Sequence, residues 1–276
     1  MRYTKMHGAG NSFVLLEDLR GELQGRDLRI LALRLCGKDG PGADGMIVVT
    51  PARDGADFGM LFYNADGSLG EMCGNGARCI ARYGVEHGLV RDPEQIRILT
   101  TAGPVSGRRI TDSLYEVRLN DPSVIRLRCR AAVSDDETVL CSYVELGSPG
   151  IPHAVVSAEA SELDCPELLR ERARSLRYSP SFPKGANVTF VCLTGPDCVR
   201  AVTYERGVED FTLACGTGCG AAAVSLILLG LVPGEALTVD MPGGRLSVRL
   251  RREGTRVSDI FLTGPTAYVY TGTVLV

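Results

Sequence analysis

The order of apolar and polar positions along the 276 residues predicts many short strands and few helices. Runs such as MIVVTP, SLYEVRL, NVTFVCL and AYVYTGTVLV are rich in β-branched and aromatic residues and end at turn residues, which is typical of strands. Residues 75–88 and 217–230 are helix-like and each end at a glycine, the residue that favours a helix C-terminus. Residues 165–178 form a third, amphipathic helical pattern.

The first two helical segments belong to a longer pattern that occurs twice. A strand-like segment precedes a Cys-Gly corner at Cys73, and another precedes a Cys-Gly corner at Cys215. Each following helix leads into a strand and a further glycine turn, and the two cysteines lie about half the chain length apart. Self-similarity over such a spacing indicates a duplicated domain.

The repeated pattern predicts an α/β (α+β) fold with two pseudo-symmetric domains, each an antiparallel sheet wrapped around one apolar helix. We expect the first domain over residues 1–121 and the second over residues 122–263. The final strand-like segment, residues 264–276, is expected to return to the first domain. The two corners place the expected active site in the cleft between the domains.

The composition is that of an ordinary globular protein, with 45% hydrophobic and 23% charged residues. The net charge is −3 and both signs are interspersed, so we expect no nucleic-acid partner. The N-terminus has no apolar run of signal-peptide type, and the run 221–229 is shorter than the roughly 20 residues of a membrane span. We therefore expect a cytoplasmic protein with no membrane partner.

Ten cysteines and three histidines raise the question of a metal or disulfide framework. The cysteines form no Cys-x-x-Cys pair and the histidines are scattered, so we expect no metal site. The chain is also too long for a small disulfide-stapled scaffold. Most of the cysteines are therefore interpreted as interior packing.

The corners at Cys73 and Cys215 are a different case. A cysteine at a helix N-terminus lies in a positive field that lowers the pKa of its thiol. The glycines that follow, Gly74 and Gly216, let backbone N–H groups approach a carboxylate. A single such corner is equally well explained as a turn with a buried cysteine, but two equivalent corners favour a paired function. Two thiols on opposite faces of one α-carbon could invert it, because one thiolate removes a proton and the other thiol returns one.

The segments NADGSLGEMCGNGARC and YERGVEDFTLACGTG resemble the two signature segments of the diaminopimelate epimerase family. MHGAGNSFVLLED, GPGADG, PHAV and NVTFV resemble its other blocks in the same order, over essentially the whole chain. The resemblance implies cofactor-independent interconversion of LL- and meso-diaminopimelate, in lysine and peptidoglycan precursor biosynthesis. It implies a small amino acid as substrate, and we expect a homodimer.

The resemblance also implies roles for individual residues. Cys73 and Cys215 match the acid/base pair, and His153 and Glu205 match groups that assist proton movement at the thiols. The residues that match the substrate-binding set are Asn11, Asn64, Gly74, Asn75, Asn187, Glu205, Arg206, Gly216 and Thr217. An arginine can bind a carboxylate through two hydrogen bonds, and asparagines both donate and accept, so the set suits a zwitterion.

Several of these residues have plainer interpretations. Asn11 and Asn64 stand beside turn residues and could be ordinary turn positions. His153 could be a loop histidine, and Arg206 a surface charge at a strand end. One departure bears on the substrate: many relatives have GNPH where this chain has GIPH, so Ile151 replaces an asparagine expected at the distal end of the substrate.

Ile151 keeps open a racemase or epimerase of the same scaffold that acts on another amino acid. A two-lobed binding protein without activity would have no use for two thiols. The stretch GPGADG formally fits a dinucleotide fingerprint but is followed by a strand-like segment, not a helix. No lysine has the context of a pyridoxal phosphate site, and a cysteine hydrolase would explain one corner only.

Overall fold

The computed structural model describes residues 1–70, 72–134 and 137–275. Glu71, in the first signature segment, and Val276, at the end of the predicted returning segment, lie outside the described residues. The chain divides into two compact units, Met1–Arg118 with Thr263–Val276, and Leu119–Leu262. Each unit is described by itself.

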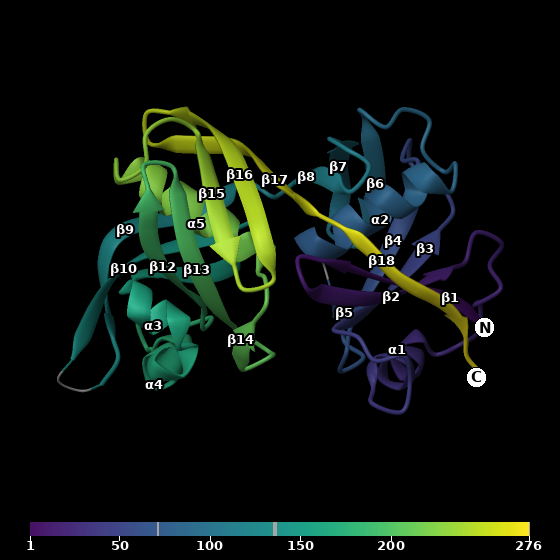
Figure 1. The fold of residues 1–276 in the computed structure, drawn as a ribbon, viewed down its shortest axis with the longest axis horizontal. Coiled ribbons are helices and arrows are strands. Elements are labelled where there is room, and N and C mark those ends of the chain that lie inside the picture. Colours follow the sequence, from purple (N-terminus) through teal and green to yellow (C-terminus); the bar gives the residue numbers. More distant parts are fainter. Residues whose placement is uncertain (71, 135–136, 276) are drawn as a thin grey trace. The chain divides into compact units, whose positions relative to one another are not determined.

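The first unit is built around one mixed sheet (Figure 1). Its strands are β1 (Arg2–Gly8), β2 (Asn11–Glu17), β3 (Gly45–Thr50), β4 (Phe58–Asn64), β5 (Leu69–Gly70), β6 (Ile96–Thr100), β7 (Gly103–Arg109), β8 (Leu114–Arg118) and β18 (Ala267–Thr273). They pair in the order β18-β1-β2-β3-β4-β6-β7-β8, with the short β5 also on β4. The pairs β2–β3 and β4–β6 are parallel and the other pairs are antiparallel.

The second unit repeats this arrangement. Its strands are β9 (Pro122–Ala132), β10 (Thr138–Leu146), β11 (Ile151–Ser157), β12 (Asn187–Gly195), β13 (Cys198–Glu205), β14 (Asp210–Thr212), β15 (Ala236–Met241), β16 (Gly244–Glu253) and β17 (Arg256–Pro265), whose last residues belong to the first unit. β9 to β13 pair in chain order, β15 lies beside β13, and β16 beside β15. The pairs β11–β12 and β13–β15 are parallel.

Each parallel pair is joined by a helical crossover, as parallel strands require. In the first unit the crossovers are α1 (Leu28–Cys36) and α2 (Gly74–Glu86). In the second unit they are α3 (Ala160–Asp164) with the 3₁₀ turn η1 (Pro166–Leu169) and α4 (Arg170–Arg177), and then α5 (Gly216–Leu228). The two units therefore share one topology, and their sheets are mixed rather than purely antiparallel.

α2 and α5 are the buried helices of their units. Small residues at the start of each helix allow it to pack closely on its sheet, and nearly all of α5 is buried. Both helices are followed by a glycine with positive φ, Gly88 at 70° and Gly230 at 72°, a conformation that stops a helix at little steric cost. The predicted central helices are thus present.

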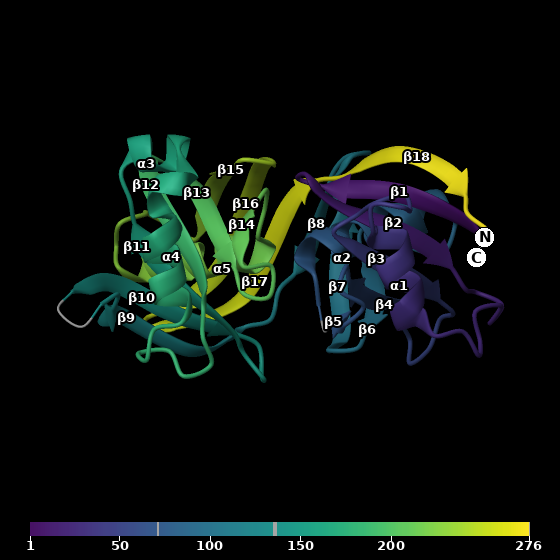
Figure 2. The same ribbon diagram turned by 90° about the horizontal axis from the view of Figure 1, so that it is seen from below.

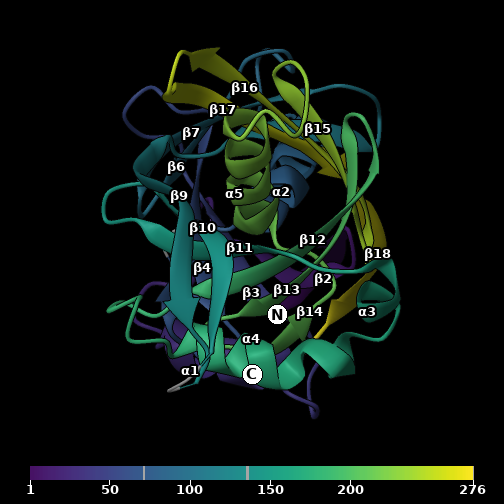
Figure 3. The ribbon, with the colours of Figure 1, turned by 90° about the vertical axis from the view of Figure 1, so that its left-hand side faces the viewer.

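The remaining helices cover the opposite faces of the sheets. α4 packs its buried side chains Ala173 and Leu176 against β12 and β13, whose other face carries α5 (Figure 3). The single helix predicted over 165–178 is in fact two, η1 and α4. α1, which was not predicted from the sequence, lies over β2 and β3 (Figure 2). Its N-cap residue is Asp27, whose carboxylate accepts the N–H groups of Arg29 and Ile30.

The last strand lies at the edge of the first unit. β18 pairs antiparallel with β1, with Thr271 opposite Thr4, and the N–H of Val274 bonds the carbonyl of Met1 at 2.8 Å. In the part of the chain that the structure describes, none of the helices has both the length and the apolar character to cross a membrane.

Candidate active site

The first corner is the start of α2. Cys73 is the N-cap residue, with extended backbone (φ −128°, ψ 112°), and its Sγ accepts the N–H of Gly76 at 3.5 Å. The thiol is partly exposed and its Sγ lies 3.8 Å from Oδ1 of Asn11. The thiol thus replaces the hydroxyl or carboxylate that usually caps a helix.

The second corner repeats this geometry at the start of α5. Cys215 is the N-cap residue (φ −118°, ψ 106°), and its Sγ accepts the N–H of Gly218 at 3.4 Å. The Sγ also lies 3.6 Å from Oγ1 of Thr217. Cys215 is 5% exposed, so this thiol is more deeply buried than that of Cys73. In both corners the first-turn N–H groups, which have no acceptor within the helix, lie next to a sulfur atom.

The third residue after each cysteine is a glycine that lies close to side chains of the sheet, so a larger residue would require those side chains to shift. A Cβ at Gly76 would lie 2.9 Å from Cδ1 of Ile47. A Cβ at Gly218 would lie 2.9 Å from Oγ1 of Thr189 and 3.0 Å from Oγ1 of Thr203. The sheet beneath α2 is therefore apolar at this point, whereas the sheet beneath α5 carries two buried hydroxyls, 3.1 Å apart.

A polar network fixes the first corner. Nδ2 of Asn75 donates to Oδ1 of Asn11 at 3.2 Å, and Oδ1 of Asn75 accepts from the Arg78 guanidinium at 2.8 Å. Arg78 is fully buried and also donates to the carbonyl of Gly74 at 3.2 Å. The structure thus brings Asn11, Gly74 and Asn75 to Cys73, and gives part of the Asn75 side chain a structural partner in Arg78.

Asn64 occupies a turn at the end of β4. Its Nδ2 donates to Oγ of Ser68 at 2.9 Å, and its N–H donates to the carbonyl of the same serine at 2.9 Å. These bonds match the turn interpretation of the sequence. A role for Asn64 in substrate binding remains a prediction.

In the second unit, three predicted site residues form a row across β11, β12 and β13. Asn187 is opposite His153 in the parallel β11–β12 pair. Glu205 lies one position beyond Tyr204, which pairs with Val188. Val188 and Tyr204 belong to the core on the α4 side, so the alternation of a strand turns Asn187 and Glu205 to the α5 side.

His153 is completely buried, and neither ring nitrogen has a hydrogen-bond partner among the described residues. Burial, and to a smaller extent the positive charge of Arg206, lower its pKa to about 3. The imidazole is therefore neutral near pH 7. The loop interpretation is wrong, since His153 is a strand residue in the interior.

Burial raises the pKa of the Cys215 thiol well above its ordinary value, and the negative charge of Glu205 raises it further. The hydrogen bonds from Thr217 and Gly218 act in the opposite direction but are smaller effects. The position of the thiol at a helix N-terminus predicts a lowered pKa. That prediction is wrong for Cys215, because desolvation of the thiolate outweighs the field of the helix. Glu205 itself accepts a hydrogen bond from the Thr212 hydroxyl.

Arg206 follows the end of β13. Its backbone N–H donates to Oδ1 of Asn187 at 2.8 Å, and its guanidinium donates to the carbonyl of Lys184 at 3.0 Å. The side chain is exposed, so the rest of the guanidinium faces solvent. The backbone of Arg206 is thus fixed next to Asn187, and its positive charge lies beside the row of His153, Asn187 and Glu205.

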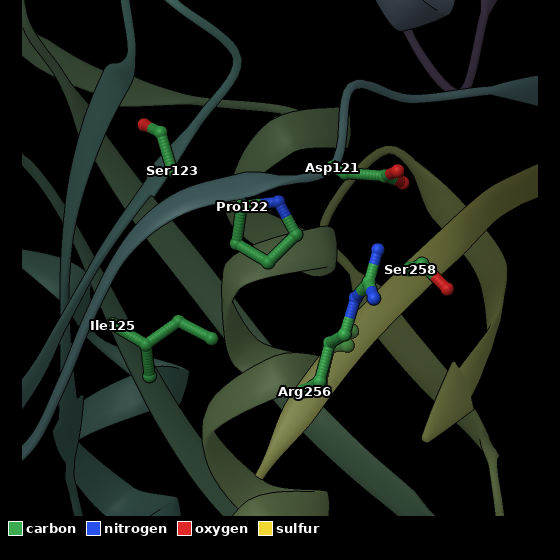
Figure 4. A pocket seen from close by; sticks show the side chains of 7 residues that line it. Asp121, Pro122, Ser123, Ile125, Arg256 and Ser258 are labelled. Carbon is green, nitrogen blue, oxygen red and sulfur yellow. The ribbon is translucent and has the colours of Figure 1, made fainter. Parts of the chain in front are cut away.

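A separate hollow in the second unit contains none of the predicted site residues. It has a volume of about 330 Å³ and lies between the start of β9 and β17 (Figure 4). Asp121 and Arg256 are its charged side chains. This hollow therefore does not mark the candidate site. The two cysteine corners are better candidates, because each places a thiol, a group that can act as an acid or a base, beside backbone N–H groups that suit a carboxylate.

A model of the diaminopimelate epimerase family matches residues 3–113 and 146–269. The chain belongs to the diaminopimelate epimerase family. Among its relatives, the diaminopimelate epimerase of Methanothrix thermoacetophila is 37% identical over 99% of this chain and 96% of its own length. Those of Archaeoglobus fulgidus and Aquifex aeolicus are 35% and 33% identical, over 98% and 99% of this chain and 95% and 97% of their own lengths.

Solved structures share the fold at lower identity. A phenazine biosynthesis protein of Bacillus anthracis, of the PhzF family, matches with a TM-score of 0.76 at 13% identity, over 100% of this chain and 99% of that one. A probable proline racemase of Agrobacterium radiobacter matches with a TM-score of 0.73 at 17% identity, over 99% and 92%. These likenesses support the α/β fold predicted from the sequence, and the fold alone.

Three residues that lie against the two corners were not predicted from the sequence: Arg78, Thr189 and Thr203. Arg78 stands in a helix of small and apolar residues, and a charged residue in such a helix is a signal of a buried polar contact. Thr189 and Thr203 carried no signal, because threonine is an ordinary strand residue. Only the register of β12 and β13 brings them together under Gly218.

Proposed function

We propose that this protein interconverts LL- and meso-diaminopimelate at one α-carbon, without a cofactor, through the thiols of Cys73 and Cys215. The observation that carries the proposal is the equivalence of the two corners: each has a thiol at a helix N-cap, and each thiol accepts the N–H of a glycine three residues later. Full-length relatives that bear the name diaminopimelate epimerase support the choice of substrate.

In the proposed reaction one cysteine, as thiolate, removes the α-proton and becomes a thiol. The other thiol gives its proton to the opposite face of the carbanion and becomes a thiolate. The two cysteines thus exchange protonation states, and turnover in the reverse direction restores them. First-turn N–H groups at Gly74, Asn75, Gly216 and Thr217 would hold the reacting carboxylate, where negative charge grows in the transition state.

The raised pKa of Cys215 supports a starting state in which this residue is the proton donor. Cys73, which is partly exposed, would then be the first base. A neutral His153 and an anionic Glu205 would assist proton transfer at the thiols, and neither residue would add a positive charge near the α-carbon.

Arg206 is the proposed contact for the distal carboxylate, because its guanidinium faces solvent beside the polar row of the second unit. Ile151, at the start of β11, offers no hydrogen bond there. This residue favours the second candidate, a racemase or epimerase of the same scaffold for a more apolar amino acid.

Solvent exchange separates these candidates. Dialysed protein in deuterated water should incorporate deuterium at the α-carbon of diaminopimelate and change the LL to meso ratio, with no added metal or pyridoxal phosphate. Exchange on an apolar amino acid but not on diaminopimelate would favour the second candidate. No exchange on any amino acid would contradict both candidates and favour a binding protein.

Two further expectations accompany this proposal. We propose that the protein acts in the cytoplasm, where the two thiols that the reaction requires stay reduced. We also propose a homodimer, which sedimentation of the purified protein would test.

A further inference from the structure

A second pair of thiols lies in the second unit, apart from the residues proposed for catalysis. Cys129 on β9 and Cys141 on β10 stand directly opposite each other in the antiparallel register. Their Sγ atoms are 3.5 Å apart. Neither residue belongs to a signature segment, and no role was predicted for either from the sequence.

The positions of the two residues suit a covalent bond. Opposite residues of an antiparallel pair have Cα atoms about 4.5–5.5 Å apart, within the range of about 4.4–6.8 Å found for disulfides. The sulfurs need to approach by roughly 1.5 Å to reach the bond length of about 2.05 Å, which small side-chain rotations provide. The backbone of β9 and β10 can therefore stay in place.

The two thiols differ in the way that a redox-active pair requires. Cys129 is partly exposed and Cys141 is 4% exposed. The hydrogen bond with Cys141, then the positive charge of Arg126, lower the pKa of Cys129 to about 6, against the effect of burial. When protonated, Cys129 donates to the carbonyl of Cys141 at 3.3 Å. The hydrogen bond between the two sulfurs and burial raise the pKa of Cys141. A partly exposed thiol with a lowered pKa beside a second thiol is the arrangement that exchanges with disulfides.

Aromatic stacking fixes the position of Arg126, whose positive charge lowers the pKa of Cys129. Its guanidinium stacks on the ring of Tyr143 at 4.4 Å, and that ring stacks on Phe182 with centroids 4.9 Å apart. The cation is thus fixed on the same two strands as the thiols.

We propose that Cys129 and Cys141 form a reversible disulfide by exchange with a small-molecule disulfide. The Cys129 thiolate attacks one sulfur of the small disulfide, forms a mixed disulfide and releases one thiolate. Cys141 then attacks Sγ of Cys129, forms the intramolecular bond and releases the second small thiol. Two protein thiols are oxidised, one disulfide is reduced to two thiols, and the two protons pass to the released thiolates.

Peptide mapping tests the bond directly. Trypsin cuts after Arg128 and Arg130, so Cys129 is recovered in a dipeptide and Cys141 in the peptide 131–170. That peptide also contains the exposed Cys165, so the experiment uses the otherwise full-length Cys165→Ser variant. The protein is equilibrated with mixtures of oxidised and reduced glutathione, blocked with N-ethylmaleimide and digested.

The dipeptide linked to peptide 131–170 should increase with the ratio of oxidised to reduced glutathione and disappear after dithiothreitol. The partly exposed Cys192, which serves as the internal control, should give at most a mixed disulfide with glutathione. A Cys129 that stays free, that stops at the mixed disulfide, or that pairs with another cysteine would overturn the proposal.

A second measurement does not depend on mapping. Oxidation of the Cys165→Ser protein should raise its melting temperature by at least about 3 °C, because the new bond restricts the unfolded chain. Adding Cys129→Ser, or the alternative Cys129→Ala, should remove this shift. An equal shift with and without Cys129 would assign it to another pair and contradict the proposal. Neither the linked peptide nor the melting temperature depends on epimerase activity. Failure of this proposal and failure of the proposed function can therefore be distinguished.

Discussion

The side-chain amide of Asn187 joins two segments of the second unit: it accepts the backbone N–H of Arg206 at 2.8 Å and donates to the carbonyl of Pro152 at 3.0 Å. Asn187 is 6% exposed, so both bonds are shielded from water. The backbone at Arg206 is thereby fixed to the start of β11, next to His153. The arginine that we propose for the distal carboxylate thus starts from a rigid position, which favours binding because less freedom is lost.

Arg206→Lys should therefore weaken substrate binding. Lysine keeps the charge but loses the planar pair of donors, and a charge-assisted hydrogen bond contributes about 1.5–3 kcal/mol. We expect KM for diaminopimelate to rise at least about tenfold and kcat to change less, because the contact is made in both ground and transition states. Steady-state kinetics would measure both.

The matched control is Arg200→Lys, on the same strand, where the arginine pairs with Asp164 instead. That variant should keep the wild-type KM. If Arg206→Lys also has the wild-type KM, Arg206 does not bind the distal carboxylate.

Ile151→Asn should separate the two candidate substrates. Ile151 is partly buried at the first position of β11, where a polar side chain can reach solvent. With diaminopimelate as substrate, the added amide should leave KM unchanged or lower it. With an apolar amino acid as substrate, the same change should raise KM, since it removes an apolar contact. Kinetics on both substrates would decide.

Much of this architecture could be predicted from the sequence, because the signals were local. Glycines after α2 and α5 marked where these helices stop, and the Cys-Gly corners marked where they start. α1 was missed because it is short, nine residues long, and because its cap, Asp27, lies close to the charged residues Arg26 and Arg29, which make the segment resemble a polar loop. The parallel pairs were missed because strand order is a non-local property that period-two alternation does not encode.

The sequence offered candidate site residues, whose roles stay predictions, but it did not reveal their electrostatics. The corner motif favours a lowered thiol pKa, and only the fold reveals that Cys215 is buried and lies near the charge of Glu205. The same limit applies to Cys129 and Cys141, twelve residues apart in sequence and adjacent only through strand register. Burial and strand register depend on the fold of the whole unit, so they cannot be predicted from a short segment of the sequence.

Loss of either corner thiol should stop the reaction. Cys73→Ser and Cys215→Ser replace a thiol by a hydroxyl, a far weaker acid, and acid/base groups typically contribute about 10²–10⁴-fold to rate. We expect epimerisation to fall by at least about 10³-fold, measured by the change in the LL to meso ratio. The controls are Cys79→Ser and Cys219→Ser, both fully buried within the helices.

The controls should lose about 1–3 kcal/mol of stability from the buried hydroxyl and keep most of their activity. A folded Cys79→Ser protein without activity, together with an active Cys73→Ser protein, would reverse the assignment of the first corner.

His153 should make stability depend on pH. Its pKa is lowered from 6.5 to about 3 in the folded protein, so between these values the unfolded chain binds a proton that the folded chain excludes. Stability should therefore fall as pH decreases through this window, by up to about 1.4 kcal/mol per pH unit from this residue. In urea unfolding at pH 7, 6 and 5, His153→Gln should show a shallower loss than wild type. Equal slopes would mean that His153 can take up a proton when folded.

Glu205→Gln should make Cys215 more reactive in the unliganded protein. The carboxylate raises the pKa of the Cys215 thiol, second only to burial, and glutamine removes this negative charge while its amide oxygen can still accept the Thr212 hydroxyl. A lower pKa increases the thiolate fraction at a given pH, and only the thiolate is alkylated. Across a pH series, the alkylation rate of Cys215 by iodoacetamide should therefore rise at lower pH in the variant than in wild type, as followed by mass spectrometry of its peptide.

Cys129, in the same digest, is the control and should react identically in both proteins. Because Glu205 is also proposed to assist proton transfer, kcat should fall in the same variant although the thiol is more reactive. If the alkylation profile of Cys215 does not move, Glu205 does not control this thiol, and its assignment as an assisting group fails with it.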